Sequence, residues 1–283
     1  MRLIDSHCHL QAAQFAADRA AVVLAAREAG VQRIVAPGWD LASSEASRSL
    51  AAGDAGIGAA VGVHPHHAAE IAPDGWARIE AWAEDPLVVA IGETVLDYDR
   101  ARAPRAAQLA NLRRHLAVAA RLGKPVILHC RSLPGHRDAQ DDLLAELRVW
   151  LESSAAGAPA SASGASVTPR REGRPPAILH SFSGPVDYAR TALDLGLMIS
   201  FSGLVFRAGE EASAEVARLA PAERLLVETD APYLAPPGAP KRRNEPRFVE
   251  VTARWLAARR AADLDLLGDL LVANHDFAFG SSR

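Results

Sequence analysis

The chain is poor in several residue types that mark common protein classes. Its 283 residues include only two cysteines and two lysines, and aromatic residues make up 5%. The two cysteines, Cys8 and Cys130, argue against a disulfide framework, and we expect both to be free packing residues. The net charge of -3 argues against a sequence-independent nucleic-acid coat, although it allows a local basic patch.

The sequence also lacks membrane and targeting signals. No apolar run approaches the length of a membrane span, and residues 1–10 show no signal-peptide pattern. We therefore expect a cytoplasmic monomer with no membrane partner.

The chain does contain eight short apolar segments separated by stretches of helical spacing. The apolar segments are 3–9, 33–37, 57–64, 87–94, 125–130, 177–182, 197–202 and 225–230. Helical stretches include 17–29, 73–84, 105–122, 139–151, 186–195 and 212–219, with closing helices at 246–260 and near 263–273. Strands that alternate with helices indicate a parallel sheet covered by helices. Eight such units predict an α/β fold, a (β/α)8 TIM barrel in one domain over residues 1–283.

Two features refine this prediction. No glycine-rich nucleotide loop follows the first segment, which weakens the alternative of an open doubly wound sheet. Residues 153–176 are rich in Ser, Ala, Gly and Pro and have no apolar periodicity. We expect a flexible surface loop there, and a lid that orders over a substrate is the alternative.

Ionisable residues stand at the carboxyl ends of several predicted strands. His7 and His9 share one face of the first strand, because side chains at i and i+2 point the same way. Further candidates end four other strands: Glu93, His129, His180 and Asp230. The carboxyl ends of barrel strands form the active-site face, and a buried ionisable group without a partner is costly. These side chains are therefore expected to share one centre.

This set predicts two divalent metal ions. We expect one ion to be held by His7, His9, Glu93 and Asp230, and the second by Glu93, His129 and His180. Lys124 enters the fifth strand at its amino end and Lys241 lies in a loop, so neither fits as a carbamylated bridging lysine. Glu93 is then the bridging anion, and Glu93 and Asp230 are the expected catalytic carboxylates. The mixed donor set leaves magnesium, manganese and zinc open.

Neighbouring polar residues have both a functional and a structural interpretation. His64 is expected to face the pocket, whereas His66 and His67 are expected on the loop surface. Arg131 either holds a phosphate or pairs with an acid, and Arg243 belongs to a basic loop that either binds phosphates or is solvated. Asp5 is expected to orient a ligand imidazole rather than to bind metal.

The motifs match a known family in chain order. They are 5–10 (DSHCHL), 62–66 (GVHPH), 91–93 (IGE), 124–129 (KPVILH), 180–184 (HSFSG), 200–203 (SFSG), 228–234 (ETDAPYL) and 243–246 (RNEP). The chain resembles the TatD-like metal-dependent deoxyribonucleases, a branch of the amidohydrolase-type barrels. The resemblance implies a 3′–5′ exonuclease that cleaves phosphodiesters of DNA with a metal-activated water, and we expect its DNA partner to be single-stranded. It also implies the same six ligands: His7, His9, Glu93, His129, His180 and Asp230.

Some departures from the family pattern keep other functions open. Val95 stands where the family usually has glycine, and residues 132–137 resemble a short insertion on the catalytic face. The alternatives are a barrel metallohydrolase acting on an amide, ester or lactone bond of a small molecule, and a non-catalytic protein that binds metal or a partner.

Overall fold

The computed structural model describes residues 1–155, 174–240 and 243–280, and within them a single eight-stranded parallel sheet follows the chain order. Its strands are β1 Leu3–Asp5, β2 Val31–Pro37, β3 Ile57–Val61, β4 Val88–Asp97, β5 Val126–Arg131, β6 Ala177–Leu179, β7 Met198–Phe201 and β8 Leu225–Val227. The chain after β1 bonds to β8 and its loop, because the Ser6 N–H donates to the Val227 carbonyl and the Asp230 N–H to the His7 carbonyl. The predicted (β/α)8 barrel is confirmed.

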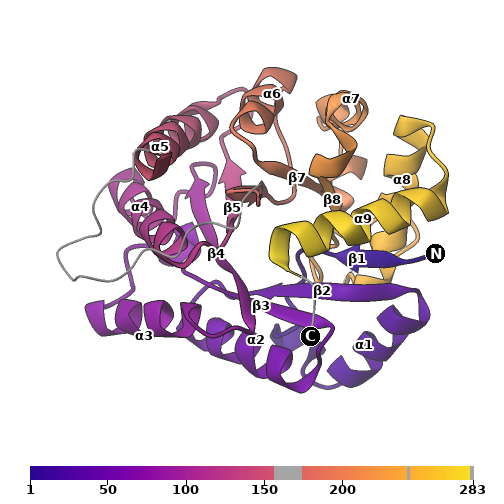
Figure 1. Cartoon of the computed structure of the whole chain (residues 1–283), viewed down its shortest axis with the longest axis horizontal. Coiled ribbons are helices and arrows are strands. Elements are labelled where there is room, and N and C mark those ends of the chain that lie inside the picture. The colour runs from indigo at the N-terminus through magenta and orange to yellow at the C-terminus, as the bar shows by residue number, and fades with distance from the viewer. Residues whose placement is uncertain (156–173, 241–242, 281–283) are drawn as a thin grey trace.

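Helices alternate with these strands and cover the outside of the sheet (Figure 1). They are α1 Arg19–Glu28, α2 Leu41–Gly53, α3 Pro73–Ala83, α4 Arg105–Leu122, α5 Asp138–Ala155, α6 Val186–Asp194, α7 Glu211–Leu219, α8 Val249–Arg260 and α9 Leu264–Phe279. Helix α2, which is rich in Ser and Ala, was not among the predicted helical stretches. Its start is fixed by a capping box, in which the Asp40 side chain accepts from the Ser43 N–H and the Ser43 hydroxyl accepts from the Asp40 N–H.

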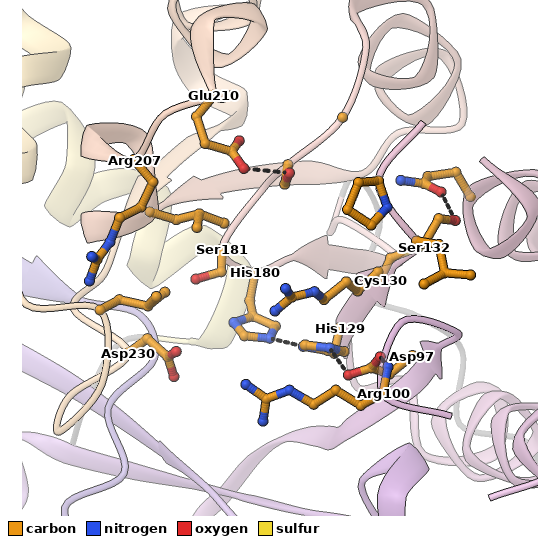
Figure 2. A pocket seen from close by; sticks show the side chains of 18 of the residues that line it. Asp97, Arg100, His129, Cys130, Ser132, His180, Ser181, Arg207, Glu210 and Asp230 are labelled. Carbon is orange, nitrogen blue, oxygen red and sulfur yellow. Dashed lines mark hydrogen bonds and ion pairs between the residues drawn. The ribbon is translucent and has the colours of Figure 1, made fainter. Parts of the chain in front are cut away.

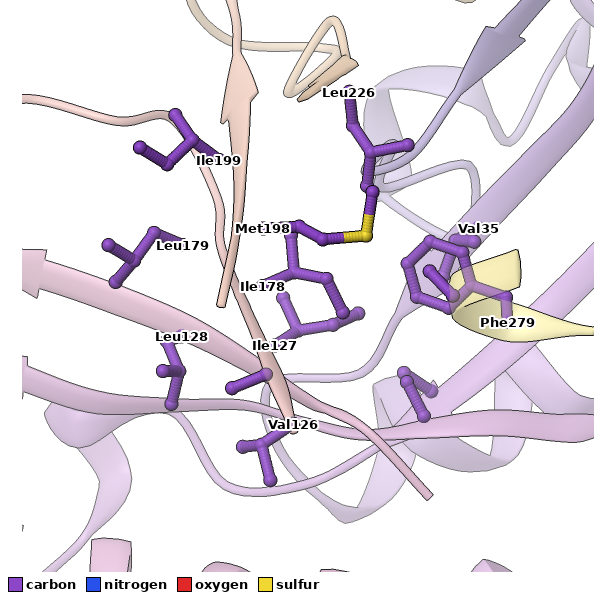
Figure 3. Close-up of a cluster of buried hydrophobic side chains, with 14 of the residues drawn as sticks. Val35, Val126, Ile127, Leu128, Ile178, Leu179, Met198, Ile199, Leu226 and Phe279 are labelled. Atoms are coloured by element: carbon purple, nitrogen blue, oxygen red, sulfur yellow. The ribbon is translucent and has the colours of Figure 1, made fainter. Parts of the chain in front are cut away.

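The core consists of aliphatic strand residues that are buried on both faces of the sheet. Figure 3 shows Met198 extending toward Leu226, beside Ile178 and Ile127. Helix α9 packs against β1 and β8, and Asn274 fixes it there by donating to the carbonyls of Ala222 and Leu225.

Five strands, β1, β3, β6, β7 and β8, are shorter than the sequence predicted, and three of these changes affect where the ligand candidates lie. β1, β6 and β8 each have three residues, so His7, His180 and Asp230 follow their strands instead of standing within them. After β1 the chain forms hydrogen bonds to β2 on one side and to the loop after β8 on the other. The Cys8 N–H donates to the Val35 carbonyl and the His9 N–H to the Ala231 carbonyl. The two imidazoles nevertheless meet on one side, as the i, i+2 argument predicted.

Strand β4 is longer than predicted and runs on to Asp97. Its register against β5 shifts between Ile91 and Thr94, so Glu93 lies at an irregular point of the ladder. Glu93 therefore lies within the strand, four residues before its end at Asp97, and lines the barrel mouth.

Two sequence predictions concern parts of the chain away from the mouth. Lys124 donates to the carbonyls of Ala83 and Asp85, next to the end of α3, so it is remote from the candidate centre as expected. Of the segment predicted as a loop, residues 153–155 belong to α5, and 156–173 lie outside the described residues. Helices in the described ranges include none that is both long and apolar enough to span a membrane.

Candidate metal centre

The carboxyl ends of the strands open into a cavity of about 1160 Å³ (Figure 2). Five of the six predicted ligands line it, namely His9, Glu93, His129, His180 and Asp230. The sixth, His7, is fully buried and stacks on His180 with 3.9 Å between the ring centroids. Residues separated by more than 200 positions thus share one wall, as the strand-end argument predicted.

One group of donor atoms gathers around the first predicted ion position. The Nε2 atoms of His7 and His9 lie 3.3 Å apart. Glu93 Oε2 lies 3.3 Å from His7 Nε2 and 3.7 Å from His9 Nε2. Asp230 Oδ1 lies 3.7 Å and 3.3 Å from the same two nitrogens. Donors that bind one ion at about 2.0–2.2 Å lie roughly 3–3.6 Å from their neighbours, so this spacing suits a divalent cation.

A second group of donors faces the other oxygen of the same carboxylate. Glu93 Oε1 lies 2.9 Å from His180 Nε2 and 3.4 Å from His129 Nδ1. These two nitrogens are 3.2 Å apart. Each oxygen of Glu93 therefore belongs to a different donor group, which is the arrangement expected of a bridging carboxylate.

The electrostatics of the centre also suit cations. Burial acts to raise the pKa of Glu93, but the charges of His180, His7 and His64 outweigh it and hold the pKa well below its usual value. Burial likewise acts to lower the pKa of His180, and the charges of Glu93 and Glu228 reverse this and raise it well above its usual value. Buried anionic carboxylates need positive charge beside them, which protonated histidines or a bound divalent ion can supply.

Two acidic residues that the sequence analysis missed hold the histidine rings. Glu228 Oε1 lies 3.1 Å from His180 Nδ1 and accepts from the Ser181 N–H at 2.8 Å. Asp97 Oδ2 lies 3.4 Å from His129 Nε2, on the ring edge away from Glu93. Such acceptors fix the tautomer and direction of a ligand imidazole. His7, His180 and Glu228 also lie close enough to form a further candidate donor trio.

Both missed residues left a signal in the sequence. Glu228 stands two positions before Asp230 in ETD, and Asp97 stands in the LDY that follows Glu93. The prediction considered one acidic residue per strand. It did not consider a second acidic residue on the same strand that could contact the other nitrogen of a ligand imidazole.

The structure places Asp5 differently from the prediction. Its carboxylate accepts from the hydroxyl and N–H of Thr229, and from the backbone N–H of His7 at 3.3 Å. Asp5 therefore ties the His7 backbone to the β8 loop, whereas the His7 ring atom Nδ1 has no hydrogen-bond partner within the described ranges. Burial raises the pKa of Asp5 to about 8.

The histidines after β3 are more deeply involved than expected. His64 lines the cavity as predicted, and its Nδ1 accepts from the His66 N–H, so Nε2 bears the proton and points toward Glu93 Oε1 at 3.6 Å. The prediction of His66 on the loop surface was wrong: its Nε2 lies 2.9 Å from Asp97 Oδ2 and its side chain is 11% exposed. His67 also lines the cavity and lies 2.8 Å from Glu70.

The two arginines expected at the substrate are engaged in ion pairs. Arg131 lines the cavity but pairs with Asp99 at 2.7 Å, the structural alternative named for it. Arg243 pairs with Asp18 at 2.9 Å and Glu245 at 2.8 Å, and it is not part of the cavity wall. Nothing in these contacts directs either guanidinium toward the donor groups.

The departures from the family pattern have clear positions. Val95 is fully buried with a φ of 124°, in the region that favours glycine, and it does not line the cavity. It therefore does not narrow the cavity by direct contact. Residues 132–136 form part of the cavity wall, so the apparent insertion does lie on the catalytic face.

The fold and the donor groups define a barrel hydrolase, and comparison with known proteins gives its family. The model of the TatD-related DNase family matches residues 4–280. Two relatives, each described as a 3′-5′ ssDNA/RNA exonuclease TatD, come from Erwinia amylovora and Klebsiella pneumoniae. Each is 36% identical, the first over 98% of this chain and 100% of its own length, the second over 98% of both. The chain belongs to the TatD-related DNase family, and it is a hydrolase of ester bonds.

Solved structures agree with this assignment. The crystal structure of YJJV, a TatD homologue from Escherichia coli K12, superposes with a TM-score of 0.83 at 25% identity, covering 99% of this chain and 98% of that one. A TatD-family hydrolase from Entamoeba histolytica superposes with a TM-score of 0.81 at 19% identity, over 99% of both chains, and shows the shared fold.

Proposed function

We propose that this chain is a 3′–5′ exonuclease of single-stranded DNA or RNA whose centre holds two divalent ions. The observation that carries the proposal is the position of Glu93, whose two oxygens each face a separate group of buried donors. The relatives that cover almost the whole chain support the choice of substrate. The alternative of an amide, ester or lactone substrate is not favoured by these comparisons.

The proposed ligands are those of the two donor groups. His7, His9, Glu93 and Asp230 would hold one ion, and Glu93, His129 and His180 the other. Divalent ions supply Lewis acidity to such a centre and stabilise the charge that develops on a reacting phosphate. Nitrogen and oxygen donors together suit magnesium, manganese or zinc.

The protein's own groups have separate tasks around these ligands. Glu228 bonds to the imidazole of His180 and would fix its direction, and Asp97 lies in ion-pair contact with the imidazole of His129. His64 presents a protonated Nε2 beside Glu93, where it can donate to a phosphate oxygen or a leaving oxygen. These groups are fixed by hydrogen bonds before substrate arrives, so the centre is preorganised.

The test is strand shortening with defined ends. A 5′-labelled single-stranded oligonucleotide incubated with the protein and magnesium, manganese or zinc should give a ladder that shortens from the 3′ end. A 3′-terminal phosphorothioate should block it, and Glu93→Gln should be inactive. If no divalent ion supports cleavage, or if label is released first from the 5′ end, the proposal is wrong.

A further inference from the structure

Three arginines at the cavity mouth have no acidic partner. Arg100, Arg102 and Arg207 are exposed and line the cavity, and none forms an ion pair within residues 1–155, 174–240 and 243–280. Most other arginines in these ranges pair with an acid or bond to a backbone carbonyl, including Arg131 and Arg137 near the same mouth. Three guanidiniums without an acidic partner thus lie where the substrate would enter.

These arginines approach the centre from two sides. Arg100 and Arg102 belong to the loop between β4 and α4, whereas Arg207 follows β7. Figure 2 shows Arg207 and Arg100 at separate edges of the cavity, with His180 and Asp230 between them in this view.

Local contacts hold the two loops in place. The Arg100 N–H donates to Asp97 Oδ1 at 2.8 Å, so the loop is tied to the residue beside His129. Glu210 is the nearest acid along the chain to Arg207, but it lies within hydrogen-bond distance of the Ser183 and Ser213 hydroxyls. The arginine side chains remain free while their loops are fixed.

The chemistry of the mouth suits a nucleic-acid strand. Guanidinium groups bind phosphates in a bidentate manner, and exposed aromatic rings stack on bases. Tyr233 is 49% exposed at the cavity and lies beside His9, with ring centroids 5.8 Å apart. Tyr233 and Arg100 line the same cavity.

We propose that Arg100 and Arg102 on one side, and Arg207 on the other, bind the phosphates that flank the scissile phosphate. This inference rests on the proposed exonuclease function. It means that the cavity accommodates a strand of several nucleotides rather than a small phosphate ester. These arginines, and not Arg131 and Arg243, would bind the phosphates of the nucleic-acid backbone.

The experiment compares a long and a short substrate. Arg207→Gln and the double variant Arg100→Gln/Arg102→Gln are assayed on a single-stranded oligonucleotide and on bis(p-nitrophenyl) phosphate. We expect kcat/KM on the oligonucleotide to fall roughly 10- to 100-fold per lost charge-assisted contact, with kcat/KM on the small diester unchanged. The slope of log(kcat/KM) against log salt should become shallower by about 0.7 per lost contact.

Controls separate this proposal from the function on which it rests. Arg190→Gln removes an exposed arginine of α6 that has no ion-pair partner among the described residues and does not line the cavity, and it should match the wild type on both substrates. Anisotropy of a labelled oligonucleotide measures binding without turnover. If the wild-type protein neither binds nor cleaves the single-stranded oligonucleotide, the exonuclease proposal is wrong. Variants that bind and cleave the strand with wild-type affinity, rate and salt slope overturn the arginine proposal alone.

Discussion

The substitution Glu228→Gln tests whether the acid behind His180 tunes the centre. The amide has the same shape, so it can still accept from the Ser181 N–H, now 2.8 Å from Glu228 Oε1. It loses the negative charge that stands 3.1 Å from His180 Nδ1 and opposes the effect of burial on that imidazole. His180 becomes a weaker base, while the packing of the barrel is retained.

The expected size of this effect comes from the position of Glu228 behind a ligand. Loss of such a partner typically costs 10- to 100-fold in metal affinity or activity, which corresponds to about 1.4–2.7 kcal/mol. The assay measures strand cleavage against metal concentration, and the half-maximal concentration should rise by about that factor. Glu223→Gln is the matched control, because Glu223 is exposed just before the same strand. An unchanged metal dependence together with an unchanged kcat would refute the reasoning.

Three further predictions concern the same barrel. His9→Ala removes one donor of the first group. Turnover should fall on the order of 100-fold or more, while the circular dichroism spectrum stays that of the wild type. Wild-type turnover would exclude His9 as a ligand. Treatment with a chelator should abolish cleavage, and readdition of metal at 100 times its Kd should raise the free energy of unfolding by about 2.7 kcal/mol, as measured by urea titration; full activity after metal removal, checked by elemental analysis, would contradict the metal assignment. His115 is buried with its pKa lowered by desolvation from 6.5 to about 4, so its neutral form stabilises the fold above pH 6.5 and about 3 kcal/mol is lost as the pH falls toward 4. The stability difference between wild type and His115→Gln should therefore shrink with acidification, and a difference independent of pH would argue against this pKa.

The fold and the donor groups were predictable because each depends on short-range pattern. Apolar segments of strand length set the barrel, and its connectivity then brought the residues at the strand ends together at one mouth. Helix α2 escaped notice because its Ser- and Ala-rich face is weakly apolar, although Asp40 and Ser43 form a capping box. The pattern also predicted several strands longer than those observed, because it included polar residues that follow the last ladder bond, such as His7, His180 and Asp230.

Partners of long or secondary polar side chains were harder to predict. Arg243 forms an ion pair with Asp18, which lies 225 positions away in sequence, and only the folded chain reveals that contact. His66 was expected on the loop surface, yet Asp97 at the end of β4 bonds to it. Such contacts depend on how far each neighbouring loop extends beyond the end of its strand, and the periodicity of the strands does not encode this.

The connection between β1 and β8 has a consequence for the synthesis of the protein. His7 and His9 are synthesised more than 200 residues before Asp230 and before the Ala231 carbonyl that fixes His9. A growing chain therefore cannot complete the first donor group until the last strand has emerged. The first donor group therefore forms only in a chain that already contains β8 and the loop after it.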